Sequence, residues 1–431
     1  MTATLTGFGA LFALLFAGMP LAFAMAIIGF VGFALTVGFN PAGAMSAQIV
    51  WDNLSSYSLS VLPLFVLMGN LINHAGLSAD LYNASNALIG HRKGGLAMAT
   101  ILASGGFAAV SGSSLATAAT MSSIALPSMR RYRYHDSLSS ATVAAGGTLG
   151  ILIPPSVIMV IYGTMTETSI AKLFMAGIIP GILGVLFYLA AVRYVVWRRP
   201  EAGPAAERMP WAERLQHLRQ VWAIALLFLI VMGGIYIGMF TATEAAGIGA
   251  TGAFVIALFK GGLSVRVLFK ILANTARTTA MLMAVLLGAL IFANFINVSG
   301  MPSAVVKAIN GLELSPYGVI FALIAFYIVL GSVFDELAMI LLTIPLFFPL
   351  VMGLGFDPIW FGIVIVMVVE IGLICPPIGM NLFIIRATLR DVPLTTIFRG
   401  IVPFVIVDVL RLALIVFVPW LVLALPSQMT H

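Results

Sequence analysis

Two pairs of consecutive prolines interrupt apolar stretches of this 431-residue chain, and their surroundings are nearly the same. Residues 150–155 are Gly-Ile-Leu-Ile-Pro-Pro, and residues 372–377 are Gly-Leu-Ile-Cys-Pro-Pro. Proline lacks a backbone N–H and clashes with the preceding helical turn, so each pair should break a helix. A broken helix exposes carbonyl oxygens at one end, which suit Na⁺, and N–H groups at the other, which suit a carboxylate.

Polar groups near both breaks add further ligands. A serine-rich turn at 111–114 precedes the first break, and an acidic turn at 331–336 precedes the second. The predicted cation ligands, through a side chain or a carbonyl, are Ser111, Ser113, Gly147, Thr148, Gly331, Asp335 and Cys375. The predicted acid-binding residues are Ser114, Ser156 and Asn381. One Pro-Pro pair alone could be a structural bend, but two copies favour a functional site.

The composition places these breaks inside a membrane. The chain is 61% hydrophobic and 8% charged, with a mean hydropathy of +1.12. A soluble protein of this size could not bury so much apolar surface, so we expect an all-α polytopic membrane protein. The net charge of +6 fits Lys and Arg gathered on the cytoplasmic side and is no sign of nucleic-acid binding. The chain lacks a phosphate-binding G-x-x-x-x-G-K-[ST] loop, which argues against ATP-driven transport.

The chain contains an internal duplication. The segment 150–155 recurs as 372–377, and Asn-Leu-Ile-Asn at 70–73 is matched by Asn-Phe-Ile-Asn at 294–297. Nearly the same spacing relates matching segments through most of the chain. We therefore predict two repeats, 1–220 and 221–431. Paired halves with broken helices are typical of secondary transporters.

Polar breaks divide the chain into apolar spans of the length that a bilayer requires. Two helices should fill 5–38, with a turn at 18–20, and residues 77–92 should lie at the interface. The remaining predicted spans are 59–75, 139–163, 171–192, 221–240, 242–259, 278–297, 358–385 and 400–425, of which 139–163 and 358–385 are the broken helices.

Two further apolar segments, 94–128 and 317–353, have polar centres and should form re-entrant hairpins. Two full spans joined by a short turn are the alternative for the first segment, although each arm is short for a crossing. Basic residues flank 94–128, whereas 317–353 has only Glu313 and Asp357 nearby. The positive-inside rule therefore opens the two hairpins toward opposite faces. Each half has five crossings and one hairpin, so the repeats should have inverted topology and both termini should be periplasmic.

Charged residues inside spans are costly and need partners or a function. We expect Asp335 to contribute to a cation site, while Glu336 beside it either does the same or faces water. Glu370 should belong either to a structural network or to ion coupling. Asp408 and Arg411 lie three residues apart on one helix and should pair. Glu244 should be a helix cap or an interface residue. No arginine is expected near the bilayer centre, so backbone N–H, hydroxyl and amide groups should hold the acid.

Taken together, these motifs resemble the large membrane subunit of a tripartite ATP-independent periplasmic (TRAP) transporter, the DctM-like family. The segments that carry the resemblance are 63–69, 109–114, 150–156, 177–181, 241–246 and 372–381. The resemblance implies Na⁺-coupled uptake of an organic acid at the bacterial inner membrane. It also implies an elevator-like fold of the ion-transporter superfamily, a soluble periplasmic substrate-binding protein and a small membrane subunit. Since the chain has no spare spans for that small subunit, a separate polypeptide is implied.

Two positions depart from the family pattern. Cys375 stands where a threonine is common, which puts a side-chain ligand there in doubt, and Ala242 stands where a proline is common. Two alternative functions stay open. One is a Na⁺/anion symporter that acts without a binding protein, and the other is an ion channel. An enzymatic activity is not expected.

Overall fold

The computed structural model describes residues 2–261, 263–311 and 313–429, and these residues form helices without any strand. In the first half the helices are α1 (Thr2–Phe16), α2 (Leu21–Val37), α3 (Phe39–Leu54), η1 (Tyr57–Ser60), α4 (Val61–His74), α5 (Leu77–Ile89), α6 (Gly95–Ser111), α7 (Ser114–Arg131), α8 (Asp136–Leu152), α9 (Val157–Thr166), α10 (Ile170–Arg198), η2 (Pro200–Ala202) and α11 (Trp211–Gln220). In the second half they are α12 (Trp222–Tyr236), α13 (Ala242–Phe259), α14 (Val265–Val298), α15 (Met301–Asn310), α16 (Pro316–Gly331), α17 (Glu336–Gly353), α18 (Pro358–Ile374), α19 (Met380–Thr388), α20 (Leu394–Phe417), α21 (Trp420–Leu423) and η3 (Pro426–Gln428).

Most predicted helices are present, and several elements differ from the prediction. The turn at 18–20 separates α1 from α2 as expected, with Gly18 at a φ of +86°. The segment 77–92 is mostly helical, as α5, and α14 begins well before the predicted 278. Helix α3 was not predicted. It exposes Trp51 and Leu54, and it joins α4 at a bend of 55°.

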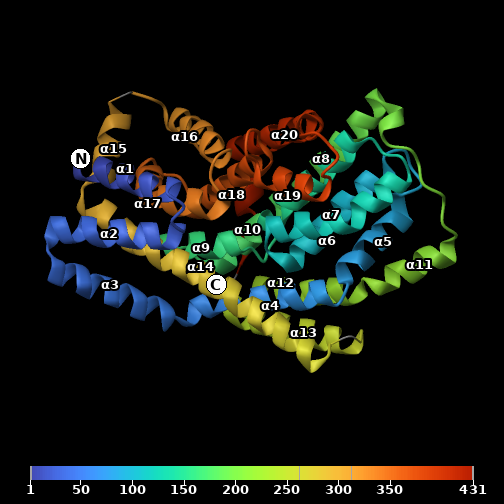
Figure 1. Ribbon diagram of the computed structural model, residues 1–431, viewed down its shortest axis with the longest axis horizontal. Helices are drawn as coiled ribbons and strands as arrows, with labels where there is room; N and C mark the ends of the chain where they lie inside the picture. The colour runs from blue at the N-terminus through green and yellow to red at the C-terminus, as the bar shows by residue number, and fades with distance from the viewer. Residues whose placement is uncertain (1, 262, 312, 430–431) are drawn as a thin grey trace.

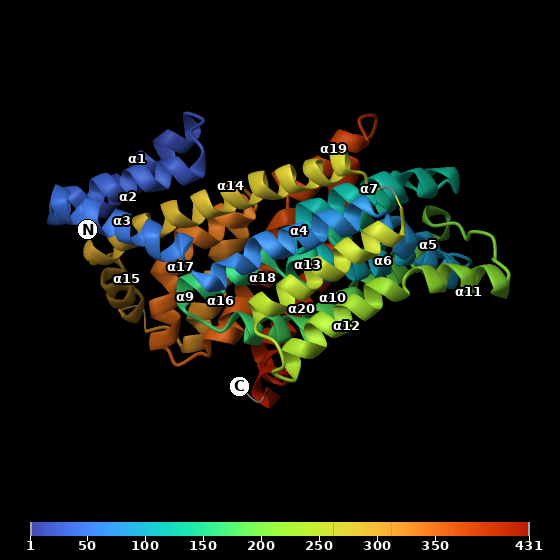
Figure 2. The same cartoon turned by 90° about the horizontal axis from the view of Figure 1, so that it is seen from below.

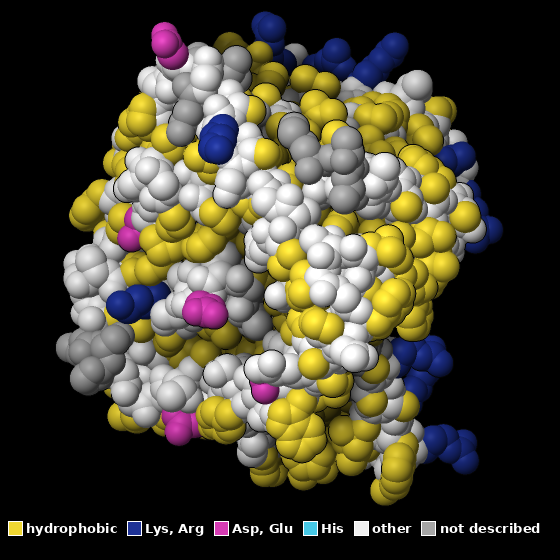
Figure 3. Space-filling model, turned by 90° about the vertical axis from the view of Figure 1, so that its left-hand side faces the viewer, with side chains coloured by type: hydrophobic (Ala, Val, Ile, Leu, Met, Phe, Trp, Pro, Cys, Tyr) yellow, Lys and Arg dark blue, Asp and Glu magenta, His cyan; other side chains and the backbone are white. Residues whose placement is uncertain are grey.

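Six helices of the described chain are long and apolar enough to cross a membrane, and the bent pairs α3–α4 and α11–α12 raise this number to eight. Helix α6, the first arm of the first hairpin, is shorter than these spans, whereas α17, the second arm of the second hairpin, is long and apolar enough to cross. Arm length therefore does not exclude a full crossing by α17. Figure 3 shows one face of the molecule, where hydrophobic side chains cover wide areas, as expected for a surface in contact with lipid.

We call α1–α4 and α12–α14 the scaffold, and α6–α10 and α16–α20 the core. Figure 1 places α3, α4 and α13 along the lower edge and α16, α18 and α20 above them, and Figure 2 shows α4 and α13 in front of α18. In the scaffold, α2 packs along α14 and α13 packs along α4. A Cβ on Gly29 would lie 2.6 Å from the Phe292 backbone, and one on Gly249 would lie 2.6 Å from Met68 Sδ. Small residues thus allow both close helix pairs.

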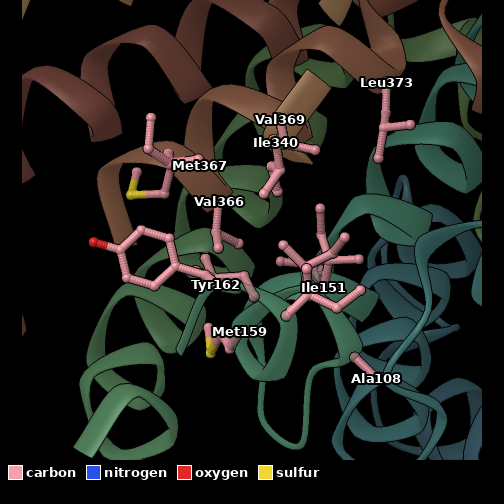
Figure 4. Close-up of a cluster of buried hydrophobic side chains, with 14 of the residues drawn as sticks. Ala108, Ile151, Met159, Tyr162, Ile340, Val366, Met367, Val369 and Leu373 are labelled. Carbon is pink, nitrogen blue, oxygen red and sulfur yellow. The ribbon is translucent and has the colours of Figure 1, made fainter. Parts of the chain in front are cut away.

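The core is built around α8 and α18. Both arms of the first hairpin, α6 and α7, pack on α8, and both arms of the second, α16 and α17, pack on α18. The hairpins also contact the broken helices of the other half, because α7 packs on α19 and α17 packs on α9. Figure 4 shows the apolar centre, where Ile151 and Met159 of the first half face Val366 and Ile340 of the second. Two hairpin arms, a broken helix and a long helix follow one another in both α6–α10 and α16–α20, whereas the repeat boundaries and the inverted orientation stay predictions.

Candidate functional site

The first hairpin turns at Gly112, whose φ of +63° favours glycine. Ser113 is the N-cap of α7, where its hydroxyl accepts a hydrogen bond from the Ala116 N–H. The Ser111 hydroxyl lies 2.8 Å from the Thr117 hydroxyl, which also donates to the Ser113 carbonyl. The serine-rich turn is therefore a compact set of oxygen atoms at a helix end.

The second hairpin turns over residues 332–335 and uses an acid at the same position. Asp335 is the N-cap of α17, and its carboxylate accepts a hydrogen bond of 2.8 Å from the Ala338 N–H. Asp335 is exposed. By contrast, the Glu336 Oε2 atom is buried and has no hydrogen-bond partner among the described residues. This oxygen of Glu336 therefore does not face water, which was one of the two expectations for the residue.

Each hairpin tip contacts the Pro-Pro break that follows it in the chain. The Val157 N–H donates to the Gly112 carbonyl at 3.4 Å, and the Ile378 N–H donates to the Ser332 carbonyl at 3.2 Å. Both Pro–Pro peptide bonds are cis. The prolines do interrupt their helices, since α8 ends at Leu152 and α18 ends at Ile374. The two predicted breaks are confirmed.

Two of the three predicted acid-binding residues meet across the halves. The Ser114 hydroxyl lies 3.2 Å from Asn381 Oδ1 and 2.9 Å from Asn381 Nδ2, which also donates to the Ala144 carbonyl at 3.1 Å. Ser114 and Asn381 are fully buried. Ser156 instead makes local bonds as the N-cap of α9, where it donates to the Ile151 carbonyl and accepts from the Met159 N–H. Ser114 and Asn381 form the polar centre of the candidate site.

The remaining predicted cation ligands have different surroundings. A Cβ on Gly147 would lie 3.1 Å from Asn381 Nδ2, so Gly147 borders the polar centre. Gly331 packs backbone to backbone against Gly372. The Cys375 carbonyl accepts a hydrogen bond from the Gly379 N–H at 3.1 Å. No group of three or more His, Cys, Asp or Glu side chains gathers within the described ranges. A cation at these tips would therefore depend on hydroxyl and carbonyl oxygens beside Asp335.

A separate charged network crosses the core. Arg411 Nη2 lies 2.6 Å from Glu370 Oε2 and 2.9 Å from Asp408 Oδ1, and the Tyr188 hydroxyl donates to Asp408 Oδ2 at 2.6 Å. The predicted Asp408–Arg411 pair is confirmed, and Glu370 has the partner that its position requires. Arg411 is fully buried, and the expectation that no arginine lies near the bilayer centre stays a prediction. The carboxylate partners of Arg411 make its burial tolerable.

Thr148 belongs to this network as the structure stands. Its hydroxyl lies 2.8 Å from the Ala145 carbonyl and 2.9 Å from the Tyr188 hydroxyl. Sequence reasoning missed Tyr188, because an isolated tyrosine in an apolar span gives no sign of its partner. The internal duplication gives the one available sequence signal, since Tyr188 and Arg411 occupy equivalent positions after the matching segments 177–180 and 400–403.

Glu244 has the structural role expected from the sequence. Thr241 is the N-cap of α13, the Glu244 N–H donates to its hydroxyl, and the Glu244 carboxylate accepts from the Thr241 N–H at 2.8 Å. This reciprocal arrangement is a capping box. Ala242, where the family often has proline, is the first residue of the helix. The departure at this position therefore leaves the helix start intact.

Comparisons with known proteins agree with this architecture. The family model described as "Tripartite ATP-independent periplasmic transporter, DctM component" matches residues 8–421. The chain is 37% identical to the C4-dicarboxylate TRAP transporter large permease protein DctM of Pseudomonas aeruginosa, over 93% of each chain. It is 32% identical to the sialic acid TRAP transporter large permease protein SiaM of Vibrio cholerae, over 96% of each.

A third relative and one solved structure extend these comparisons. The isethionate TRAP transporter permease protein DctMQ of Oleidesulfovibrio alaskensis is 33% identical over 88% of this chain and 59% of its own length. The crystal structure of the Alcanivorax borkumensis YdaH transporter has a TM-score of 0.64 at 15% identity, covers 94% of this chain and 98% of its own, and supports the fold alone. The family model and the two full-length relatives establish that the chain belongs to the DctM family of tripartite ATP-independent periplasmic transporters.

Proposed function

We propose that this chain performs Na⁺-coupled uptake of an organic acid across the bacterial inner membrane, as the large membrane subunit of a TRAP transporter. The observation that carries the proposal is the buried Ser114–Asn381 contact, which joins the first hairpin tip to the second broken helix. Relatives transport C4-dicarboxylates, sialic acid and ectoine according to their names. An organic acid is therefore the proposed class of substrate.

The polar centre has the chemistry that a carboxylate requires. Ser114 is the first residue of α7, and Asn381 is the second residue of α19. The N-termini of two helices, with their partial positive charge, thus converge on one hydrogen-bonded pair. Arg411 is not needed for the acid, because Glu370 and Asp408 already pair with it. Since Ser114 and Asn381 are fully buried, the acid would replace their mutual hydrogen bond when a tip opens.

The proposed Na⁺ sites lie at the two tips. They comprise Ser111 and Ser113 with the carbonyl groups near Gly147, and Asp335 with the carbonyl groups of Gly331 and Cys375. Thr148 is left out, because its hydroxyl pairs with Tyr188. Uptake into proteoliposomes that contain the complete transporter should stop when K⁺ replaces Na⁺. Undiminished uptake in K⁺ would refute the coupling.

The proposed partners are a periplasmic binding protein and a small membrane subunit on a separate polypeptide. This chain covers only 59% of the DctMQ relative, whose remaining length supports a second membrane component beside the large subunit. Reconstituted large and small subunits should take up the acid only when the loaded binding protein is added. Equal uptake without it would favour the stand-alone symporter. Single-channel currents would favour a channel.

For the mechanism, we propose that the core, about 94–192 and 317–425, moves against a scaffold of 5–75 and 221–297. Gly69 of α4 lies close to the end of α6, where a Cβ on Gly69 would be 3.2 Å from the Val110 carbonyl oxygen. The absence of a side chain at this contact supports movement of the core along the scaffold. The Phe65 and Phe174 rings, 5.7 Å apart, offer a crosslinking position between scaffold and core. In a Cys375→Ala background, crosslinked Phe65→Cys/Phe174→Cys protein should bind Na⁺ but not transport. Wild-type transport after complete crosslinking contradicts the moving core.

Orientation can be tested separately. The proposal places Arg92 on the cytoplasmic side and Asp357 on the periplasmic side, with both termini periplasmic. Single cysteines at positions 92 and 357, again with Cys375→Ala, should react with an impermeant thiol reagent from opposite sides of the membrane. Labelling from the same side would rule out inverted repeats.

A further inference from the structure

The charged network in the core joins four helices and is closed to solvent. Thr148 comes from α8, Tyr188 from α10, Glu370 from α18, and Asp408 and Arg411 from α20. All five side chains are fully buried. The Arg411 guanidinium packs directly on Gly184 of α10, where a Cβ would collide with it. The core therefore accommodates the network, because Gly184 leaves the room that the Arg411 guanidinium occupies.

Two pairs of network residues occupy equivalent positions in the repeats. Thr148 and Glu370 stand at matching positions before the two Pro-Pro breaks, and Tyr188 and Arg411 each lie eight residues after the proline of a matching Gly-Ile-x-Pro segment, 177–180 and 400–403. The hydrogen bonds run from Thr148 through Tyr188 to Asp408, and then through Arg411 to Glu370. The network thus links the two halves of the core where their equivalent positions meet.

The formal charges of this network do not balance. Two carboxylates and one guanidinium sum to −1 when all three are ionised. Four atoms lack a hydrogen-bond partner among the described residues: Glu370 Oε1, Asp408 Oδ1, Arg411 Nε and Arg411 Nη1. Of these, Asp408 Oδ1 still lies 2.9 Å from the guanidinium, whereas Glu370 Oε1 has no donor. A buried, uncompensated charge is strongly unfavourable, so one more positive charge is required.

No other described group supplies that charge. Facing Glu370 are Tyr188 of α10 and Asp408 and Arg411 of α20, while α8 contributes only the Thr148 hydroxyl. The other helices packed on α18 carry Tyr162 (α9), Tyr317 and Tyr327 (α16), Glu336 (α17) and Arg386 (α19), none of which is bonded to the network. The Arg386 guanidinium instead donates to the Leu389 and Arg390 carbonyls.

A metal cation fits this position poorly, because the guanidinium already lies between the carboxylates and its unpaired N–H groups would repel a second cation. A water molecule could pair with Arg411 Nε or Nη1 but would leave the net charge unchanged. We propose that one proton resides on Glu370 Oε1, so that the core contains a neutral, proton-binding cluster. This cluster is distinct from the tips that the proposed function assigns to Na⁺ and the acid.

Infrared spectroscopy of the purified full-length protein in deuterated buffer tests this assignment. A protonated carboxyl group has a C=O stretch that is separate from the carboxylate bands. Wild type should show this band at neutral pH, and Glu370→Gln should lose it. Asp408→Asn should lose it too, because Glu370 then becomes the single carboxylate that pairs with Arg411. Glu244→Gln, the same substitution at the capping box, should keep the band.

Stability provides an independent measurement. Gln is a neutral isostere of protonated Glu, so Glu370→Gln should fold and melt like wild type, whereas Arg411→Gln should lower the melting temperature. A wild-type protein without the band, a band that survives in Glu370→Gln, or a Glu370→Gln variant that fails to fold would each overturn the proposal. A band that disappears when Na⁺ replaces K⁺ would show that a cation neutralises the cluster instead.

Discussion

The two hairpin tips have the same backbone architecture but different side chains. In both, an N-cap residue begins the second arm, and a tip carbonyl accepts a hydrogen bond from the segment after the Pro-Pro pair. The N-cap is Ser113 in the first tip and Asp335 in the second. In the first tip the next residue is Ser114, which bonds to Asn381. In the second tip it is Glu336, whose Oε2 atom has no hydrogen-bond partner in the described part of the chain. The two tips thus share a backbone arrangement but differ in side-chain chemistry.

The partner side of each tip differs in the same way. Asn381 in α19 supplies an amide to the first tip, whereas the equivalent position of the first repeat is Met159 in α9, the helix that packs on the second hairpin. A hydroxyl and an amide suit an anionic ligand, and a carboxylate tip suits a cation. We therefore expect substitutions at equivalent positions to have unequal effects on transport wherever the side chain matters, and equal effects wherever only the backbone matters.

The largest difference is expected between Asn381 and Met159. Asn381→Leu removes the amide that pairs with the Ser114 hydroxyl, which has no other hydrogen-bond partner among the described residues. The acid would lose the same amide, and a hydrogen bond to a charged group contributes about 1.5–3 kcal/mol, so acid uptake in proteoliposomes should fall roughly 10- to 100-fold. Met159→Leu conserves volume and should keep near wild-type uptake. Equal losses in the two variants would contradict the division of roles.

The next effect should be equal in the two halves, because it concerns the backbone alone. A Cβ on Gly372 would lie 2.7 Å from the Gly331 Cα, and one on Gly150 would collide with the Ser113 carbonyl. Gly372→Ala and Gly150→Ala should therefore each destabilise the protein by about 1–3 kcal/mol, measured as a lower melting temperature. Gly233→Ala, in an α12 position open on all sides, should be neutral or slightly stabilising. A large difference between the first two variants would mean that the tips do not pack alike.

Much of this architecture could be predicted from the sequence because prolines and glycines determine it locally. The two breaks at 154–155 and 376–377 follow from proline chemistry, and the hairpin turns follow from short polar runs in apolar segments. The Ser114–Asn381 contact was expected only as a shared site, since no sequence signal specifies a hydrogen bond between two residues so far apart in the chain.

Other contacts of the site could not be predicted, for physical reasons. Ser156 and Thr148 stay predictions as ligands, and in this structure their hydroxyls bond locally or to Tyr188, because a hydroxyl in a helix readily finds a backbone partner. The contact between Arg411 and Glu370 was not predicted, because the two residues lie on different helices, α20 and α18. Tertiary pairing of this kind leaves no local pattern.

A smaller effect separates the two N-caps. Ser113→Ala and Asp335→Ala both remove a helix cap, which costs about 1 kcal/mol in each case. Asp335→Asn keeps a capping oxygen but removes the charge. If Asp335 binds Na⁺, the Na⁺ concentration for half-maximal uptake should rise roughly tenfold in Asp335→Asn, equivalent to about 1.4 kcal/mol. Ser264→Ala, which removes the N-cap of α14 outside the proposed Na⁺ sites, serves as the matched cap variant, and an unchanged Na⁺ dependence in Asp335→Asn removes the carboxylate from the coupling site.

The smallest effect concerns a surface contact that joins the halves. Arg130, at the end of α7, pairs with Asp136 of its own half and, at 2.8 Å, with Asp391 of the other. The hydrogen bond from the Arg130 side chain lowers the pKa of Asp391. Because the folded pKa lies below the unfolded value, this contact stabilises the protein above the unfolded pKa, and its contribution is lost as the pH falls through the folded pKa.

Asp391→Asn should therefore lower the melting temperature by less than about 2 °C at pH 7, because exposed ion pairs contribute little and two partners share this arginine. Below the ordinary pKa of aspartate the difference from wild type should shrink toward zero, since the wild-type carboxyl is then also neutral. Raised salt should reduce the difference at pH 7 in the same way. Melting curves of both proteins across this pH range provide the measurement, and a difference that grows as the pH falls would show that Arg130 does not hold Asp391 in its charged form.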